Sequence, residues 1–183
     1  MHRRAQGLLA RREFSRRELA QRLARGMRRA DAASAAAAEA SAIRTSSAGE
    51  GQAVGLHQEE EHDAAAVSRE RTALIDAVLD DLTSVGSLSD ERFVSAFVDG
   101  RVQRGKGPLL IRAELRERGA DEALIDRFLT FPNTFWIERV RAVRARRYGE
   151  VLPRDAGERQ RQARFLASRG FAGDLIRRAF EVD

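Results

Sequence analysis

The chain has 183 residues, which is enough for one or two domains with a buried core. Hydrophobic residues make up 43% and charged residues 33%, and the abundant alanine, leucine, arginine and glutamate are strong helix formers that favour an all-α protein. The net charge is +5, and every basic residue except Lys106 is arginine, so we expect an acidic partner such as nucleic acid. The lack of cysteine excludes disulfides, thiol catalysis and cysteine metal sites.

The sequence carries no recognisable signal for a membrane or for export. No apolar run approaches the about 20 residues that a membrane span requires. The basic N-terminal stretch is not followed by the apolar stretch of a signal peptide. We therefore expect a cytoplasmic protein that has no membrane partner. We also expect it to be a monomer.

Two helices are predicted at the start of the chain. Residues 2–13 form the first and direct their leucines towards a core. Ser15 is suited to cap the second helix, because Glu18 stands three residues later and completes a capping box. Gly26 matches the residue that commonly follows a helix end, since glycine tolerates a positive φ.

An insert is predicted to follow. Residues 27–69 contain an alanine tract, a stretch rich in serine and glycine, and a run of three glutamates, with few large apolar residues. Such a segment buries too little apolar surface to offset its ordering entropy. We therefore expect it to be mostly disordered, with at most a transient helix in the alanine tract.

A short apolar signature recurs three times. It begins with a Leu-Ile pair and occupies residues 74–79, 124–129 and 175–180, so the copies are 50 and 51 residues apart. In each copy the apolar residues stand at i, i+1, i+4 and i+5, which is one face of a helix. The recurrence predicts an internal repeat.

The elements between the signatures complete the repeats. Ser89 or Asp90 is expected to cap one helix, and Pro108 is expected to start another, because proline is tolerated in the first turn. Gly119 and Gly170 each stand five residues before a Leu-Ile pair and are expected to end helices. Further helices are predicted at residues 135–148 and 159–169.

Together these elements predict an all-α, elongated array of three tandem three-helix repeats. The first repeat spans residues 1–86 and is interrupted by the insert at 27–69. The second repeat spans residues 87–131, and the third spans residues 132–183.

Several stretches resemble the RecX family, the regulators of the RecA recombinase. The stretches are residues 8–19, 86–93, 105–108 and 164–171. The resemblance implies a helical, modular protein that binds along the groove of the RecA–DNA filament and usually inhibits ATP hydrolysis and strand exchange. It also implies a role in homologous recombination, DNA repair and the SOS response, with no catalytic activity and no cofactor or metal of its own.

Arginine clusters are the candidate contacts with RecA or DNA, because a guanidinium can chelate carboxylate or phosphate through its fork of donors. The candidates are Arg11, Arg12, Arg16, Arg17, Arg101, Arg104, Lys106, Arg112, Arg139, Arg144 and Arg147. For any one of them, the alternative is a solvated helix face with ion pairs to nearby acids.

Other patterns are weaker. Residues 100–107 nearly match a phosphate-binding loop, but Gly107 replaces the Ser or Thr that holds magnesium, so we expect an inter-helix turn that approaches the partner's backbone. His57 and His62 are five residues apart, off one helical face, which disfavours a metal site. Trp136 is expected in the core, with base stacking as the alternative.

Two other function classes remain open from the sequence. The first is a stand-alone DNA-binding protein that acts without RecA, which the basic balance would suit. The second is an enzyme such as a nuclease, for which the sequence offers no group of residues arranged for catalysis.

Overall fold

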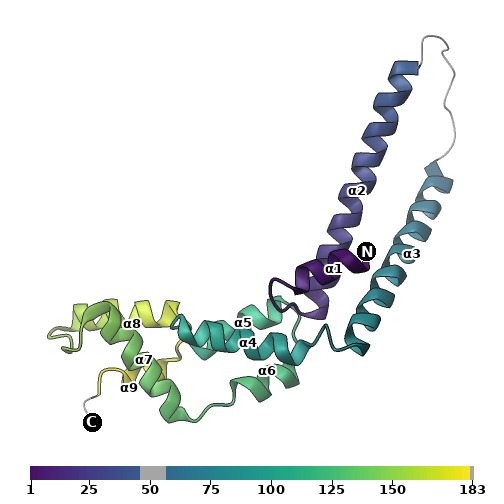
Figure 1. Ribbon diagram of the computed structural model, residues 1–183. Helices are drawn as coiled ribbons and strands as arrows, with labels where there is room; N and C mark the ends of the chain where they lie inside the picture. Colours follow the sequence, from purple (N-terminus) through teal and green to yellow (C-terminus); the bar gives the residue numbers. More distant parts are fainter. Residues whose placement is uncertain (46–56, 182–183) are drawn as a thin grey trace. The chain divides into compact units, whose positions relative to one another are not determined.

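The computed structural model describes residues 1–45 and 57–181, which form helices and loops and no strand (Figure 1). The helices are α1 (His2–Leu9), α2 (Arg16–Thr45), α3 (His57–Ser84), α4 (Asp90–Gln103), α5 (Pro108–Glu117), α6 (Glu122–Leu129), α7 (Asn133–Tyr148), α8 (Ala156–Ser168) and α9 (Gly173–Arg178). The all-α prediction is confirmed. The chain divides into two compact units, Met1–Leu88 and Ser89–Asp183.

The first unit is built from α1, α2 and α3. Its core is made of apolar side chains from all three helices and the loops that flank them: Ala5, Phe14, Leu19, Leu23, Ile75, Leu79, Leu82 and Leu88. Ser15 caps α2 as predicted, because its hydroxyl oxygen accepts a hydrogen bond from the Glu18 backbone N–H at 3.0 Å.

The prediction that Gly26 ends a helix is wrong. The helix α2 continues through Gly26 to Thr45, and Gly26 is buried. A Cβ at this position would overlap the guanidinium of Arg4. The glycine therefore lets the Arg4 side chain lie against α2, and it does not provide a left-handed residue for a helix end.

The predicted disorder of the insert is also wrong over most of its length. Residues 27–45 continue α2, and residues 57–69 open α3. The two helices contact each other, and Arg71 of α3 forms an ion pair with Asp31 of α2. Alanine has a high helix propensity, which favours the continuation of α2 although residues 28–38 are exposed. Residues 46–56 lie outside the described residues.

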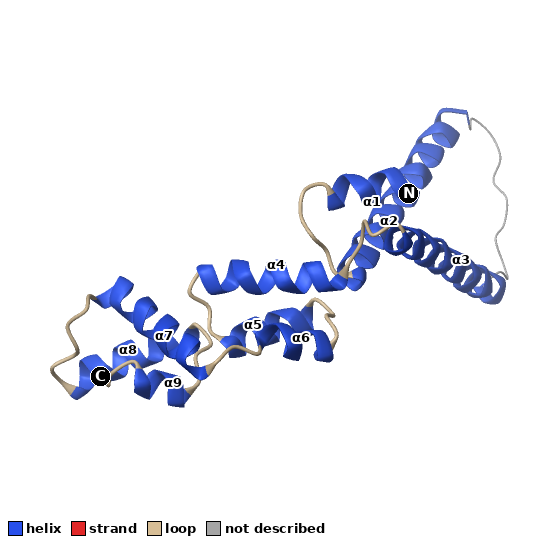
Figure 2. Ribbon diagram, turned by 60° about the horizontal axis from the view of Figure 1, so that its bottom comes forward, coloured by secondary structure: helices blue, strands red, loops and turns tan. Residues whose placement is uncertain are grey.

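The second unit contains two three-helix groups, α4–α6 and α7–α9, that share one hydrophobic core (Figure 2). Side chains buried in this core come from both groups: Phe93, Val94, Val98, Ile111, Leu115, Ile125, Leu129, Trp136, Val140, Leu166, Phe171, Leu175, Ala179 and Phe180. Trp136 is thus a core residue, packed against the rings of Phe131 and Phe135.

The predicted helix ends of this unit are confirmed. Ser89 caps α4 by accepting from the Arg92 backbone N–H, and Pro108 occupies the first turn of α5. Gly119 and Gly170 follow α5 and α8 with φ of 75° and 87°, where a side chain would be strained. The repeat boundaries at 86/87 and 131/132 fall in loops, and we retain them as proposals.

A backbone clasp joins the two helix groups. The Gly107 N–H donates to the Arg169 carbonyl oxygen at 2.7 Å, and the Leu109 N–H donates to that of Gly170 at 3.1 Å. A Cβ on Gly107 would overlap the backbone of Gly170. The segment that nearly matched a phosphate-binding loop is therefore the end of α4 and a turn, and the backbone it approaches belongs to this chain's own third repeat.

Candidate functional site: an arginine cleft

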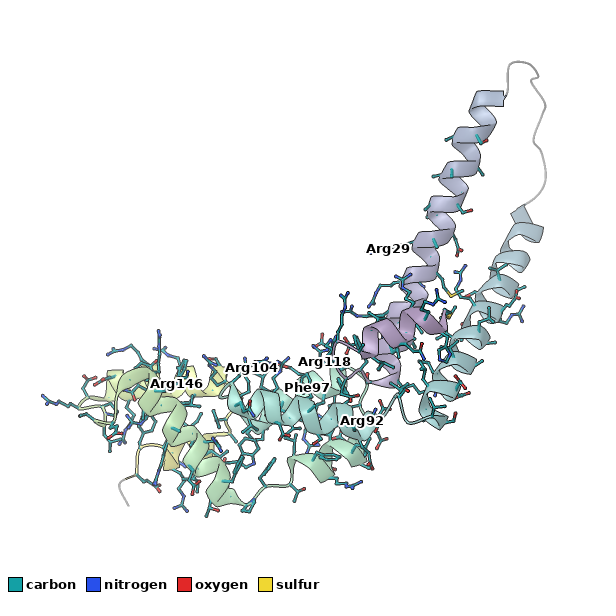
Figure 3. The ribbon with its side chains drawn as sticks, in the orientation of Figure 1. Arg29, Arg92, Phe97, Arg104, Arg118 and Arg146 are labelled. Atoms are coloured by element: carbon teal, nitrogen blue, oxygen red, sulfur yellow. The ribbon has the colours of Figure 1, made fainter. Side chains whose placement is uncertain are left out.

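A cleft of about 610 Å³ opens in the second unit between the end of α4, one face of α7, and α8. Five of the residues that line it are arginines, here called the cleft arginines: Arg104, Arg139, Arg146, Arg147 and Arg169. Val143 and Phe165 supply apolar surface, and no carboxylate is among the residues that line the cleft. Figure 3 shows Arg104 at the end of α4 and Arg146 on α7.

Helical spacing explains the contribution of α7. Arg139, Val143, Arg146 and Arg147 stand at i, i+4, i+7 and i+8, so they share one face of the helix. Trp136 and Val140 enter the core from the adjoining face of the helix. The burial of one face thus turns the arginines of the other face towards the cleft.

Two contacts hold the other walls in place. Gly105 has a φ of 71°, and a Cβ on it would lie 2.8 Å from Cγ2 of Val143, so only glycine lets the α4 turn approach α7 this closely. The Arg169 side chain donates to the carbonyl oxygen of Arg104 at 3.3 Å. The backbone clasp and this hydrogen bond therefore bring the ends of α4 and α8 together.

Among the residues that the structure describes, no acid is paired with a cleft arginine. Within residues 1–45 and 57–181, none of the five forms an ion pair with a carboxylate. The Arg139 guanidinium lies 5.1 Å from the Phe135 ring centre, and that of Arg169 lies 5.1 Å from the Phe165 ring centre. The arrangement can therefore bind an anion by charge and by directed N–H donors.

Other candidate residues of the second unit have partners within the fold. Arg101 pairs with Glu114 at 2.5 Å and lies over the Phe97 ring. Arg112 pairs with Asp126 at 2.6 Å and also with Glu122. Hydrogen bonding to Asp126 raises the pKa of Arg112 above its usual value. Lys106, a further candidate, is half-buried in the turn between α4 and α5.

Glu122 also pairs with Arg116, which is exposed. Its hydrogen bond to Glu122 raises the pKa of Arg116 and lowers the pKa of Glu122, because the charged forms stabilise each other. Arg112 and Arg116 of α5 with Glu122 and Asp126 of α6 form what we call the α5–α6 ion cluster. Its arginines are neutralised locally, in contrast to the cleft arginines.

Arg144, another candidate, is buried and does not line the cleft. Its side chain is 5% exposed and donates to the carbonyl oxygens of Glu150 and Val151, at 2.8 and 3.1 Å. It therefore holds the loop that follows α7. Its position one residue after Val143 turns it away from the cleft.

The candidates of the first unit differ in their surroundings. Arg11 and Arg17 are exposed. Arg12 pairs with Glu18 at 2.5 Å and lies 3.9 Å from the Phe14 ring centre, and Arg16 pairs with Asp80 at 2.7 Å. The ion pairs of Arg12 and Arg16 therefore connect elements within the first unit.

The structure thus brings together three predicted residues, Arg104, Arg139 and Arg147, and adds two that were not chosen. Arg146 was detectable, because it stands seven residues after Arg139 and shares its helical face. Arg169 carried no such signal, since its approach to Arg104 depends on the clasp between the repeats. The side chains of His57 and His62 lie outside the described residues.

Comparisons with known proteins identify the family. Residues 89–129 match the model of the RecX second three-helix domain, and residues 137–180 match that of the third. The chain is 37% identical over 172 residues to the regulatory protein RecX of Halorhodospira halophila, covering 94% of this chain and 81% of the relative. The chain belongs to the RecX family.

Two further comparisons agree with membership of the RecX family. The RecX of Pseudomonas savastanoi pv. phaseolicola is 43% identical over 105 residues, which cover 57% of this chain and 68% of that protein. The crystal structure of RecX from Lactobacillus salivarius superposes with a TM-score of 0.61 at 16% identity, covering 97% of this chain and 90% of that one. The first supports the family, and the second supports the fold.

Membership places the chain among regulatory proteins and confirms the resemblance seen in its sequence. In the part of the chain that the structure describes, no helix is long and apolar enough to cross a membrane.

Proposed function

We propose that this protein is a regulator, usually negative, of the RecA recombinase and that it binds the RecA–DNA filament through the cleft arginines. The observation that carries the proposal is the convergence of five arginines on one cleft without a carboxylate in its lining. A filament on DNA presents phosphates, which such guanidinium groups bind through charge and paired hydrogen bonds. Membership of the RecX family supports RecA as the partner.

The mechanism follows from a binding surface built on one packed unit. A protein in the filament groove that contacts neighbouring RecA subunits stabilises one arrangement of them. It thereby opposes the changes that ATP turnover and strand exchange require. The shared core of α4–α9 lets the second unit act as a single rigid clamp in this model. We place this activity in recombination, DNA repair and the SOS response, in the cytoplasm, with the regulator as a monomer.

The test is the single-stranded-DNA-dependent ATPase rate of RecA from the same organism, with this protein titrated in. A variant R104E/R146E/R147E reverses three cleft arginines. A control variant R154E/R164E/R177E makes the same change in net charge at exposed arginines of the same unit that do not line the cleft. We expect the cleft variant to require at least about tenfold more protein for half-inhibition, about 1.4 kcal/mol of binding, while the control resembles the parent.

Circular dichroism should show equal helicity for all three proteins, because the substituted residues are exposed. Equal inhibition by the cleft variant and the control would place the binding surface elsewhere. Absence of inhibition by the parent protein, with intact RecA filaments, would contradict the function itself.

An order-of-addition experiment separates two ways of inhibiting. Protein added to completed filaments should still slow ATP hydrolysis if it bridges subunits in the groove. Inhibition that appears only when the protein precedes filament assembly would instead indicate a block of filament growth.

The cleft arginines also suit a second candidate, a DNA-binding protein that acts without RecA. This function predicts tight binding to naked DNA, with an affinity that falls steeply as salt rises because bound counterions are released from the phosphates. The proposed function predicts instead that RecA increases the affinity for DNA. Fluorescence anisotropy with a labelled oligonucleotide, with and without RecA, distinguishes the two.

A further inference from the structure

Five arginines line the cleft, whereas other arginines of the second unit are paired with acids. Arg101, Arg112 and Arg127 each pair with a glutamate of a neighbouring element. The cleft arginines line one cavity and have no such partner among the described residues. Like charges gathered in this way repel one another, and a multiply charged anion relieves the repulsion of all of them at once.

The size of the cleft is compatible with a small ligand. Its volume of about 610 Å³ lies within the range of about 300–1,000 Å³ that is typical of ligand pockets. Its wall is also partly apolar, through Val143 and the Phe165 ring. Tyr148 braces that ring edge-on, with ring centres 5.5 Å apart. The cleft therefore offers an aromatic surface beside a concentrated positive charge.

We propose that the cleft is a binding site for a nucleoside triphosphate. The triphosphate lies among Arg104, Arg146 and Arg147, and the base lies against Phe165 and Val143. Guanidinium groups bind phosphate oxygens through paired donors, and aromatic rings stack on bases. A nucleic-acid strand spreads its charges along the backbone at one per phosphate, whereas a triphosphate concentrates several charges in one compact group. The convergent arginines match the compact group.

The site adds a regulatory property that rests on the proposed function. A bound nucleotide occupies the same arginines that we assign to the filament, so nucleotide and filament compete for the cleft. The nucleotide concentration then sets how much of the regulator is free to act. Nucleotide binding itself needs neither RecA nor DNA, so the two proposals can fail separately.

Isothermal titration calorimetry on the full-length protein alone tests the site, with ATP as the probe. We expect saturable one-to-one binding with a Kd on the order of 100 µM or tighter. Inorganic tripolyphosphate should compete but bind at least about threefold more weakly, because it lacks the base. The variant R104E/R146E/R147E should weaken ATP binding at least tenfold, while R154E/R164E/R177E should leave it unchanged.

A second variant tests the aromatic wall. Phe165→Leu keeps an apolar side chain on α8 and removes the ring, so it should weaken ATP binding severalfold and leave tripolyphosphate binding unchanged. Equal loss for both ligands would contradict a base contact. Helicity measured by circular dichroism verifies that the variant is folded.

Three results would overturn the proposal. The first is the lack of ATP binding up to about 5 mM, which corresponds to an affinity too weak to matter in a cell. The second is equal affinity for ATP and tripolyphosphate, which would make the cleft a simple polyanion site. The third is binding of a ten-nucleotide oligonucleotide that depends on the cleft arginines and that ATP does not displace.

Discussion

The cleft arginines and the α5–α6 ion cluster are two arginine-rich regions of the same unit, and they differ in what surrounds them. Arg112 and Arg116 meet Glu122 and Asp126 across a helix junction. The cleft arginines line one cavity with apolar side chains and without a carboxylate. The number of arginines in a segment therefore does not decide whether they are available to a partner; the acids that the fold brings beside them do.

The difference follows the placement of charged residues at the ends of the helices. The helix α6 starts with Glu122 in its first turn, where a negative charge favours the helix dipole, and this acid lies beside the arginines of α5. The first turn of α7 has no acid, and its last turn carries Arg146 and Arg147. The arginines of α5 are thus paired with an acid at the start of α6, whereas Arg146 and Arg147 stand at the end of α7 without such an acid beside them within the described ranges.

The largest expected effect comes from Gly170→Ala, which breaks the clasp that shapes the cleft. Gly170 has a φ of 87°, and a Cβ there would overlap Leu110. We expect a loss of about 3 kcal/mol in the free energy of unfolding, from backbone strain and steric overlap. We also expect weaker binding of the RecA filament, because the clasp holds the walls of the cleft together. Urea denaturation measures the loss.

Gly173→Ala is the matched control for this substitution. It lies three residues later, where an added Cβ meets nothing within 4 Å. Its stability should therefore stay close to that of the parent. A Gly170→Ala protein as stable as the control would show that the clasp does not constrain the fold.

A smaller effect is expected from the double variant R112E/R116E, which reverses the arginines of the α5–α6 ion cluster. Four acids would then lie together, so the thermal midpoint should fall modestly. Inhibition of RecA should change by no more than about twofold, because exposed charges outside the binding surface are screened by salt. Inhibition lost to the same extent as in the cleft variant would remove the distinction between the two regions.

The smallest effect concerns the pH dependence of Glu122. Its hydrogen bond from Arg116 lowers its pKa below the usual 4.5, so its ionised form stabilises the fold at neutral pH. That stabilisation is lost as the pH falls below 4.5 and through the lowered pKa. Glu122→Gln should therefore be slightly less stable than the parent at pH 7, and the difference should shrink as the pH falls below 4.5.

Urea midpoints at pH 7, 5, 4 and 3 measure this difference, with Glu117→Gln as a control on an exposed glutamate of α5. A difference that stays constant across this range would show that the ionisation of Glu122 does not contribute.

Much of the second unit could be predicted from the sequence because its signals are local. Ser89 and Pro108 mark helix starts, and Gly119 and Gly170 mark helix ends, through the chemistry of one or two turns. The first unit shows the limit of this reasoning. Gly26 is the same residue type as Gly170, yet it lies within α2, where its backbone is helical and the Arg4 guanidinium of another helix lies against it.

The candidate site could also be predicted only in part. Helical periodicity alone places Arg139 and Arg147 on one face of α7. The burial of Arg144 depends on the loop that follows α7, so the sequence of the helix does not distinguish Arg144 from the other two.

By itself, the sequence determined the helical class, the repeat, most helix ends and the family resemblance, because these depend on residues close together in the chain. Only the tertiary structure decided that α2 and α3 continue through most of the insert and that Arg104, Arg146 and Arg169 line one cleft. The cleft depends on packing between segments that are far apart in the sequence, where the backbone clasp between α5 and the end of α8 sets which side chains meet.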